Sequence, residues 1–185
     1  MLKDVLFAIW FFAPAGIANG TPIITAKLPG LTRLNAPMDF GYSFHGQRIF
    51  GAHKTWRGFI SAIIMSTVTL ALQQYLVAHF AWAAHLTSAV DYRRLPLLIL
   101  GPLFGIGALG GDAIESFFKR QRHLPPGEGW FPFDQTDYII GGALVTVPFV
   151  HLSFTEYILL ILFWFVAHIV VTYLGFLVKL RDRPI

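Results

Sequence analysis

The chain has 185 residues, of which 55% are hydrophobic and only 13% charged, and it carries a formal net charge of +4. Soluble domains average about 25% charged residues, so this composition excludes an ordinary soluble domain and indicates one membrane-embedded domain over residues 1–185. Cysteine is absent, which excludes disulfides, cysteine-ligated metals and a catalytic thiol.

Five apolar segments have about the length that a helix needs to cross a bilayer. They cover about residues 5–26, 58–82, 95–118, 137–154 and 156–178. The first contains Pro14, Gly16 and Gly20, which predicts an irregular helix, and it runs on too far for a cleaved signal peptide. The fourth is short. We therefore expect an all-α integral membrane protein with about five transmembrane helices.

Positive charge is distributed unevenly between the two sides of this arrangement. Three cations lie on the side of the N-terminus and the 83–94 and 153–156 segments, and eleven lie in the loops 27–57 and 119–136 and the C-terminal tail. Because cytoplasmic segments are enriched in Lys and Arg, the two long loops are predicted to be cytoplasmic and the N-terminus outside. The cations border apolar segments, so we expect phosphate and membrane lipids as partners, and no nucleic acid.

The third segment ends in four polar residues spaced to share one face of a helix. They are Asp112, Glu115, Ser116 and Lys119. Carboxylates at a membrane boundary are costly to desolvate and indicate a functional site. Asp134 and Asp137 open the fourth segment. Taken alone, Asp134 would be read as a helix N-cap with Asp137 in the first turn, and Asp112 or Glu115 as an ion-pair partner of Lys119. Taken together, the two acidic pairs favour a shared metal site.

A glycine pattern from Gly105 to Gly110 matches GxGxxG. The dinucleotide-binding form of this pattern follows a strand, whereas here it lies inside an apolar segment. The small-residue pairs Gly101/Gly105 and Gly107/Gly111 instead predict close packing between helices.

The residues just before the second segment include Lys54, Thr55 and Arg57. A helix N-terminus attracts anions, and these side chains are donors of the kind that bind phosphate. The alternative is that the cations serve only as topological anchors, with Trp56 at the interface. Asn19, near the cytoplasmic end of the first segment, either bends that helix or binds a ligand.

Two stretches together carry a pattern that covers nearly the whole chain. The first comprises Ala18-Asn19-Gly20-Thr21-Pro22, Arg48-Ile49-Phe50-Gly51 and His53-Lys54-Thr55-Trp56-Arg57-Gly58; the second comprises Gly111-Asp112, Glu115-Ser116, Lys119-Arg120, Pro126-Gly127 and Asp134-Gln135-Thr136-Asp137. This pattern resembles that of membrane cytidylyltransferases that make CDP-activated lipids, and more closely that of the CDP-archaeol synthase family.

The resemblance implies a Mg²⁺-dependent enzyme that transfers a cytidylyl group from CTP to a lipid phosphate and releases pyrophosphate. The lipid would be an unsaturated archaetidic acid, bis-O-geranylgeranylglyceryl phosphate, with its chains in an apolar groove between helices and the active site facing the cytoplasm. Two alternatives stay open. One is a phosphatidate cytidylyltransferase that makes CDP-diacylglycerol, and the other is a non-enzymatic cation-binding or transport protein.

The resemblance also implies roles for individual residues. Metal ligands would be Asp112, Asp134 and Asp137, with Glu115 a weaker candidate. The catalytic set would add Lys119 and Arg120, which would hold pyrophosphate oxygens. Substrate-binding residues would be Asn19, Lys54, Thr55, Arg57, Glu115 and Ser116. The sequence predicts no oligomeric state.

Overall fold

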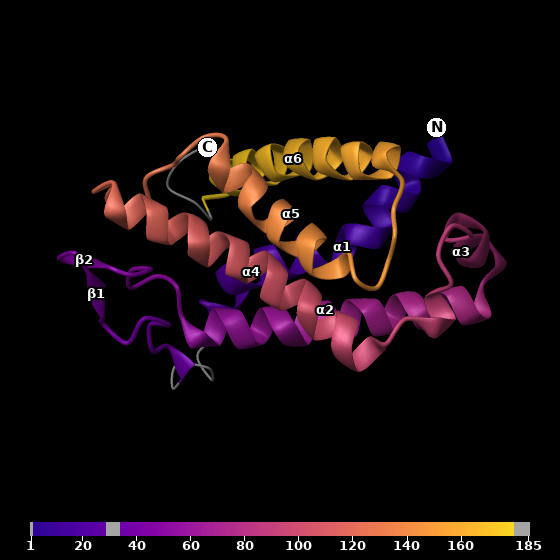
Figure 1. The fold of residues 1–185 in the computed structure, drawn as a ribbon, viewed down its shortest axis with the longest axis horizontal. Coiled ribbons are helices and arrows are strands. Elements are labelled where there is room, and N and C mark those ends of the chain that lie inside the picture. The colour runs from indigo at the N-terminus through magenta and orange to yellow at the C-terminus, as the bar shows by residue number, and fades with distance from the viewer. Residues whose placement is uncertain (1, 29–33, 180–185) are drawn as a thin grey trace.

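The computed structural model describes residues 2–28 and 34–179, and its long elements are all helices (Figure 1). In chain order these are α1 (Leu2–Thr25), α2 (Trp56–His79), α3 (Ala81–Leu86), α4 (Leu97–Gln121), α5 (Phe133–Thr146) and α6 (Phe154–Leu177). A two-stranded antiparallel hairpin, β1 (Ser43–Phe44) and β2 (Gln47–Arg48), lies between α1 and α2. A short 3₁₀ turn, η2 (Tyr92–Arg94), precedes α4. The predicted all-α class is confirmed.

Among the described residues, four helices are long and apolar enough to cross a membrane: α1, α2, α4 and α6. They match the first, second, third and fifth predicted segments to within about three residues at each end. The fourth segment was placed at 137–154, but α5 begins at Phe133 and has only 14 residues. Its early end has a physical reason, because Pro148 lacks an N–H and cannot donate the next hydrogen bond of the helix.

Helix α4 lies at the centre of the bundle and packs through glycine on two sides. A β-carbon added at Gly105 would lie 2.7 Å from the Cα of Ile63 in α2, and one added at Gly107 would lie 2.6 Å from the carbonyl oxygen of Gly141 in α5. The hydroxyl of Ser66 donates to the Gly101 carbonyl at 2.7 Å. The glycine pattern therefore serves close helix packing, as predicted.

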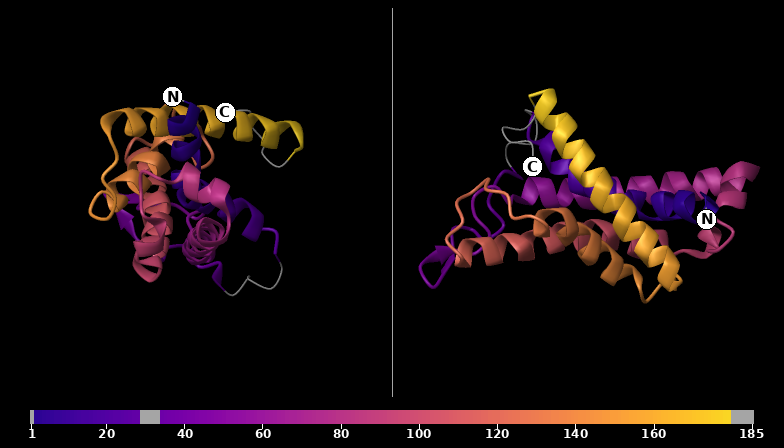
Figure 2. Two further views of the ribbon diagram at one scale, coloured as in Figure 1. Left: turned by 90° about the vertical axis from the view of Figure 1, so that its right-hand side faces the viewer. Right: turned by 90° about the horizontal axis from the view of Figure 1, so that it is seen from above.

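Helix α6 crosses the other helices obliquely (Figure 2) and leaves most of its apolar side chains exposed, as expected for a lipid-facing helix. Its contact with α1 is aromatic, because the Phe12 and Trp164 rings meet at 5.8 Å. The ends of α1 and α4 and the starts of α2 and α5 gather at one end of the bundle, opposite the N-terminus (Figure 1). We call this end the loop end, since both long loops lie there.

Candidate active site at the loop end

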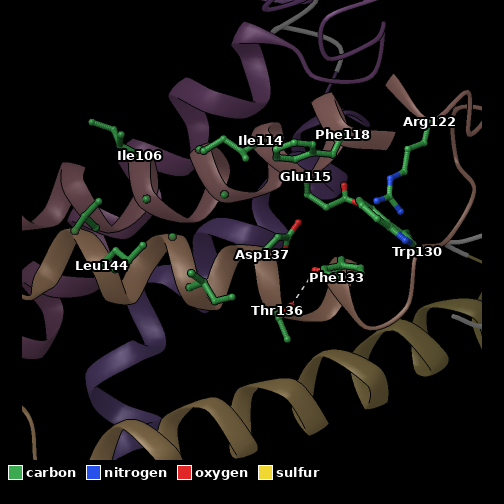
Figure 3. A pocket seen from close by; sticks show the side chains of 16 residues that line it. Ile106, Ile114, Glu115, Phe118, Arg122, Trp130, Phe133, Thr136, Asp137 and Leu144 are labelled. Carbon is green, nitrogen blue, oxygen red and sulfur yellow. Dashed lines mark hydrogen bonds between the residues drawn. The ribbon is translucent and has the colours of Figure 1, made fainter. Parts of the chain in front are cut away.

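Three carboxylates meet where α4 and α5 approach each other. One oxygen from each of Asp112, Glu115 and Asp137 lies within 4.8 Å of the others. Figure 3 shows Glu115 and Asp137 directed into the space between the two helices. The approach depends on Gly111, where an added β-carbon would lie 2.2 Å from the Asp137 carbonyl oxygen. The structure thus brings together two of the three predicted metal ligands, Asp112 and Asp137, with Glu115.

Lys54 joins this group from the loop ahead of α2. Its Nζ donates to both oxygens of Asp112, at 2.6 and 2.7 Å. Burial alone would lower the pKa of Lys54, but the Asp112 carboxylate, aided by Asp137 and Glu115, raises it above its ordinary value. Lys54 therefore stays cationic at neutral pH. Thr55, predicted to bind substrate, is the N-cap of α2 and accepts a hydrogen bond from the Gly58 N–H at 3.3 Å.

Asp134 lies outside the three-carboxylate group. It accepts hydrogen bonds from the Lys119 ammonium and from the Trp130 backbone N–H. It occupies the first turn of α5 and is not the N-cap, which is Pro132. The structure therefore shows Asp134 fixing Lys119 and the start of α5.

One oxygen of Glu115 is left without a hydrogen bond. Glu115 Oε1 is buried and, although it lies 3.2 Å from Lys119 Nζ, receives no hydrogen bond from it. Carboxylate oxygens are the ligands that Mg²⁺ prefers. The three carboxylates, whose oxygens lie within 4.8 Å of one another, therefore form a donor set that fits a divalent cation.

Two arginines line the loop end without a carboxylate partner. Arg57 is 9% exposed and Arg120 is 8% exposed, and the Nε of each is buried with no hydrogen-bond partner in residues 2–28 and 34–179. Among the described residues, Arg120 donates to the Pro125 carbonyl alone, at 3.3 Å. No ion pair involves either residue within the part of the chain that the structure describes. Because an unpaired buried charge is strongly unfavourable, both guanidinium groups are suited to a bound anion.

The remaining predicted residues are placed as follows. Ser116 is buried in α4. Asn19 lines a separate cavity of about 80 Å³ between α1 and α6, together with Tyr138 and His168. The predicted role of Asn19 in ligand binding therefore concerns a different cavity from the one beside the carboxylates.

An apolar groove of about 640 Å³ runs between α4 and α5. Glu115 and Asp137 lie along it, and the Arg122 guanidinium sits 5.0 Å from the centre of the Trp130 ring at its loop end (Figure 3). Its walls include side chains on the exposed surface of the helices, namely Ile106, Ile114, Ile140 and Leu144. The groove is thus open sideways, on the surface where lipid would lie.

The chain is similar in sequence to CDP-archaeol synthases over its whole length. The family model described as "CarS-like: CDP-archaeol synthase" matches residues 1–185. The chain is 35% identical to the CDP-archaeol synthase of Pyrococcus furiosus over 162 residues, which cover 87% of this chain and 86% of that protein. It is 30% identical to the CDP-archaeol synthase of Thermococcus gammatolerans over 184 residues, covering 99% and 98%.

A solved structure of an intramembrane enzyme for archaeal membrane lipid biosynthesis has the same fold. It superposes with a TM-score of 0.69 and covers 89% of this chain and 91% of its own, at 23% sequence identity. At that identity the likeness speaks for the fold alone, and it agrees with the helical membrane architecture described above.

Proposed function

Because this chain belongs to the CDP-archaeol synthase family and is thus a CTP-dependent cytidylyltransferase, we propose that it uses Mg²⁺ to transfer the cytidylyl group of CTP to an archaetidic-acid-type lipid phosphate. The proposal rests chiefly on one arrangement: three carboxylates that meet along an apolar groove, at the end of the bundle that also carries the buried side chains of Arg57 and Arg120. Family membership speaks against the alternative of a non-enzymatic cation-binding protein.

The reaction needs no general base. An oxygen of the lipid phosphate attacks the α-phosphorus of CTP, a new O–P bond forms, and the bond to the oxygen bridging the α- and β-phosphates breaks. Pyrophosphate leaves with the electron pair of that bond. Since the second pKa of a phosphate monoester is about 6, the attacking group is already mostly a dianion at neutral pH. The main obstacle is the repulsion between two anions.

Positively charged side chains of the protein would offset the repulsion between the two phosphate groups. Arg57 and Arg120, both buried, would bind the triphosphate, and Lys119, held by Asp134, would face the leaving pyrophosphate. Asp112, Glu115 and Asp137 would hold Mg²⁺, which when bound neutralises phosphate charge and makes the phosphorus more electrophilic. We assign Asp134 the role of positioning Lys119. Glu115 replaces Asp134 as the third proposed metal ligand.

The role of Arg57 can be tested by a substitution that keeps its charge. Lysine in its place preserves the cation but loses the planar fork that binds phosphate through two hydrogen bonds. We expect Arg57→Lys to lower kcat/KM for CTP about tenfold, which corresponds to about 1.4 kcal/mol of transition-state stabilisation. Arg94→Lys, at an exposed position on the opposite end of the bundle, is the control. Unchanged kinetics for Arg57→Lys would show that this residue is only a topological anchor.

The groove predicts where the lipid chains lie. Gly110 lines it, and a β-carbon added there would have no atom within 4 Å, so a larger side chain fills the groove without disturbing the protein. We expect Gly110→Leu to raise the KM for the lipid phosphate about tenfold, a loss of about 1.4 kcal/mol of binding, and to leave the KM for CTP unchanged. Gly20→Leu, in equally open space on α1 outside the groove, is the matched control. A lipid KM equal in both variants would place the chains elsewhere.

The identity of the lipid is tested directly by competition between substrates. The purified protein, with CTP and Mg²⁺, is offered an ether lipid phosphate carrying isoprenoid chains and a diacyl phosphatidate of matched length. The proposal predicts the higher kcat/KM for the ether lipid. A preference for phosphatidate would favour the alternative product, CDP-diacylglycerol.

We further propose that the loop end faces the cytoplasm and the N-terminus lies outside, on the charge asymmetry of the loops. Because the chain has no cysteine, single cysteines give no background. Ala52 and Ala89 are both exposed and lie at opposite ends of the bundle. An impermeant maleimide added to intact cells should label Ala89→Cys and spare Ala52→Cys until the cells are lysed. The reverse pattern would invert the topology.

A further inference from the structure

The loop between α1 and α2 is organised around one buried carboxylate, that of Asp39, which sequence analysis did not single out. Its side chain is 0% exposed. It accepts hydrogen bonds from the backbone N–H groups of Gly41 at 3.1 Å, Phe50 at 3.1 Å and Gly51 at 2.9 Å, and from the Arg48 guanidinium through Nε, at 3.1 Å, and Nη2. One side chain therefore ties together the two ends of the segment 39–51.

The charge state of Asp39 matches this role. Burial by itself would raise the pKa of Asp39, but the Arg48 guanidinium and the three backbone N–H groups lower it well below its ordinary value. The carboxylate is thus ionised at neutral pH, and Arg48 neutralises it. Neither charge is left over for a substrate.

The clamped segment touches the proposed nucleotide site at Gly51. This glycine has a φ of +94°, and a β-carbon added to it would lie 3.7 Å from the Cδ of Arg120. The backbone of Gly51, held by Asp39, therefore lies next to the Arg120 side chain, with room between them for one methyl group.

The residues immediately before the segment 39–51 contact the backbone of Lys54 and its neighbours. The Met38 N–H donates to the Lys54 carbonyl at 2.7 Å, and the Trp56 N–H donates to the Ala36 carbonyl at 3.0 Å. Residues 36–38 thus pair with 54–56, immediately before Asp39. The position of Lys54 and the packing of Arg120 both depend on the same short stretch of backbone.

We infer that Asp39 is a positioning residue for nucleotide binding: it holds the 39–51 segment so that Gly51 supports Arg120 and the paired 36–38 stretch supports Lys54. It contacts no substrate itself. This inference rests on the proposed role of Arg120 in binding CTP and on the expectation that Lys54 binds substrate. It differs from a purely structural role in predicting an effect on CTP and none on the lipid.

Two matched pairs of variants test the inference, each measured by calorimetric titration of CTP into the full-length protein in detergent without lipid. Asp39→Asn puts an amide among groups that only donate, and we expect CTP to bind about tenfold more weakly. Asp91→Asn is its control, because Asp91 also accepts from a backbone N–H and pairs with an arginine, but in the loop at the other end. In a separate turnover assay at saturating CTP, the KM for lipid should stay within about twofold of the wild type in both variants.

The second pair acts through the backbone. Gly51→Ala and Gly46→Ala introduce the same strain, because both glycines have positive φ, +94° and +80°. The strain at Gly51 would shift the backbone beside Arg120, whereas Gly46 is at the hairpin tip with nothing within 4 Å of an added β-carbon. We expect weaker CTP binding for Gly51→Ala alone, with similar thermal stability for the two. This pair decides the question even if Asp39→Asn fails to fold.

Arg120→Ala separates the two ways in which the idea can fail. If Arg120→Ala weakens CTP binding but Gly51→Ala binds CTP as tightly as Gly46→Ala, the positioning role is wrong and the nucleotide site stands. If Arg120→Ala and Lys54→Ala both bind CTP normally, the nucleotide site is misplaced, and the positioning role falls with it.

Discussion

Asp137→Asn is expected to lower turnover by a factor on the order of 10²–10³, the scale seen when one preorganised charge-stabilising group is lost. Asparagine has the volume of aspartate, so the packing of α5 against α4 should persist. What disappears is one of the three anionic charges gathered within 4.8 Å, and with it the affinity for a divalent cation. Asp112→Asn should behave in the same way and also leave Lys54 without its partner.

The measurement is a magnesium titration of activity with each purified variant, together with thermal unfolding to confirm a folded protein. Glu156→Gln is a suitable control, since Glu156 is a carboxylate that caps α6 at the opposite end of the bundle. Near-normal activity of either aspartate variant across the titration would exclude that residue as an essential metal ligand.

Gly111→Ala is expected to damage both stability and activity, although it adds one methyl group. The new β-carbon would lie 2.2 Å from the Asp137 carbonyl oxygen, so α4 and α5 must separate at the point where their carboxylates meet. Overpacking of this kind costs about 1–3 kcal/mol, and a displacement of about 1 Å at a reacting site costs on the order of 10²-fold in rate.

The neighbouring glycine provides the control for this prediction. Gly110→Ala makes the same chemical change one residue earlier, where an added β-carbon meets nothing within 4 Å. We expect it to retain its thermal stability and nearly full turnover. If Gly111→Ala matches Gly110→Ala in both measurements, the close approach of the two helices is not needed to assemble the site.

The long helices could be predicted from sequence because each is an apolar run of about membrane length. The shorter elements could not. Helix α5 has 14 residues, so its bounds depend on local features such as Pro148 and the Asp134 contact with Trp130. The hairpin around Gly46 and the clamp of Asp39 consist of hydrogen bonds between residues up to 12 positions apart. Neither leaves a periodic pattern in the sequence.

Most residues of the candidate site could be predicted from the sequence, but the contacts between individual acids and cations could not. The spacing of Asp112 and Glu115 placed both on one helix face, and Asp137 was expected to approach them from the next segment. Which acid meets which cation depends on three-dimensional distances. Lys119 contacts both Glu115 and Asp134, and it thereby links Asp134 to the edge of the three-carboxylate group. Sequence spacing alone gives no means to choose between these partners.

The most direct test of the central claim follows the phosphorus atoms of CTP. The purified protein, an ether lipid phosphate and Mg²⁺ are incubated with CTP radiolabelled at either the α- or the γ-phosphate. Cytidylyl transfer predicts that the α-label enters the organic-extractable lipid and that the γ-label is released as pyrophosphate. Neither the incorporation nor the release should occur when EDTA chelates the Mg²⁺. Transfer of the γ-label to lipid, or no α-label in lipid with any lipid phosphate, would contradict the account.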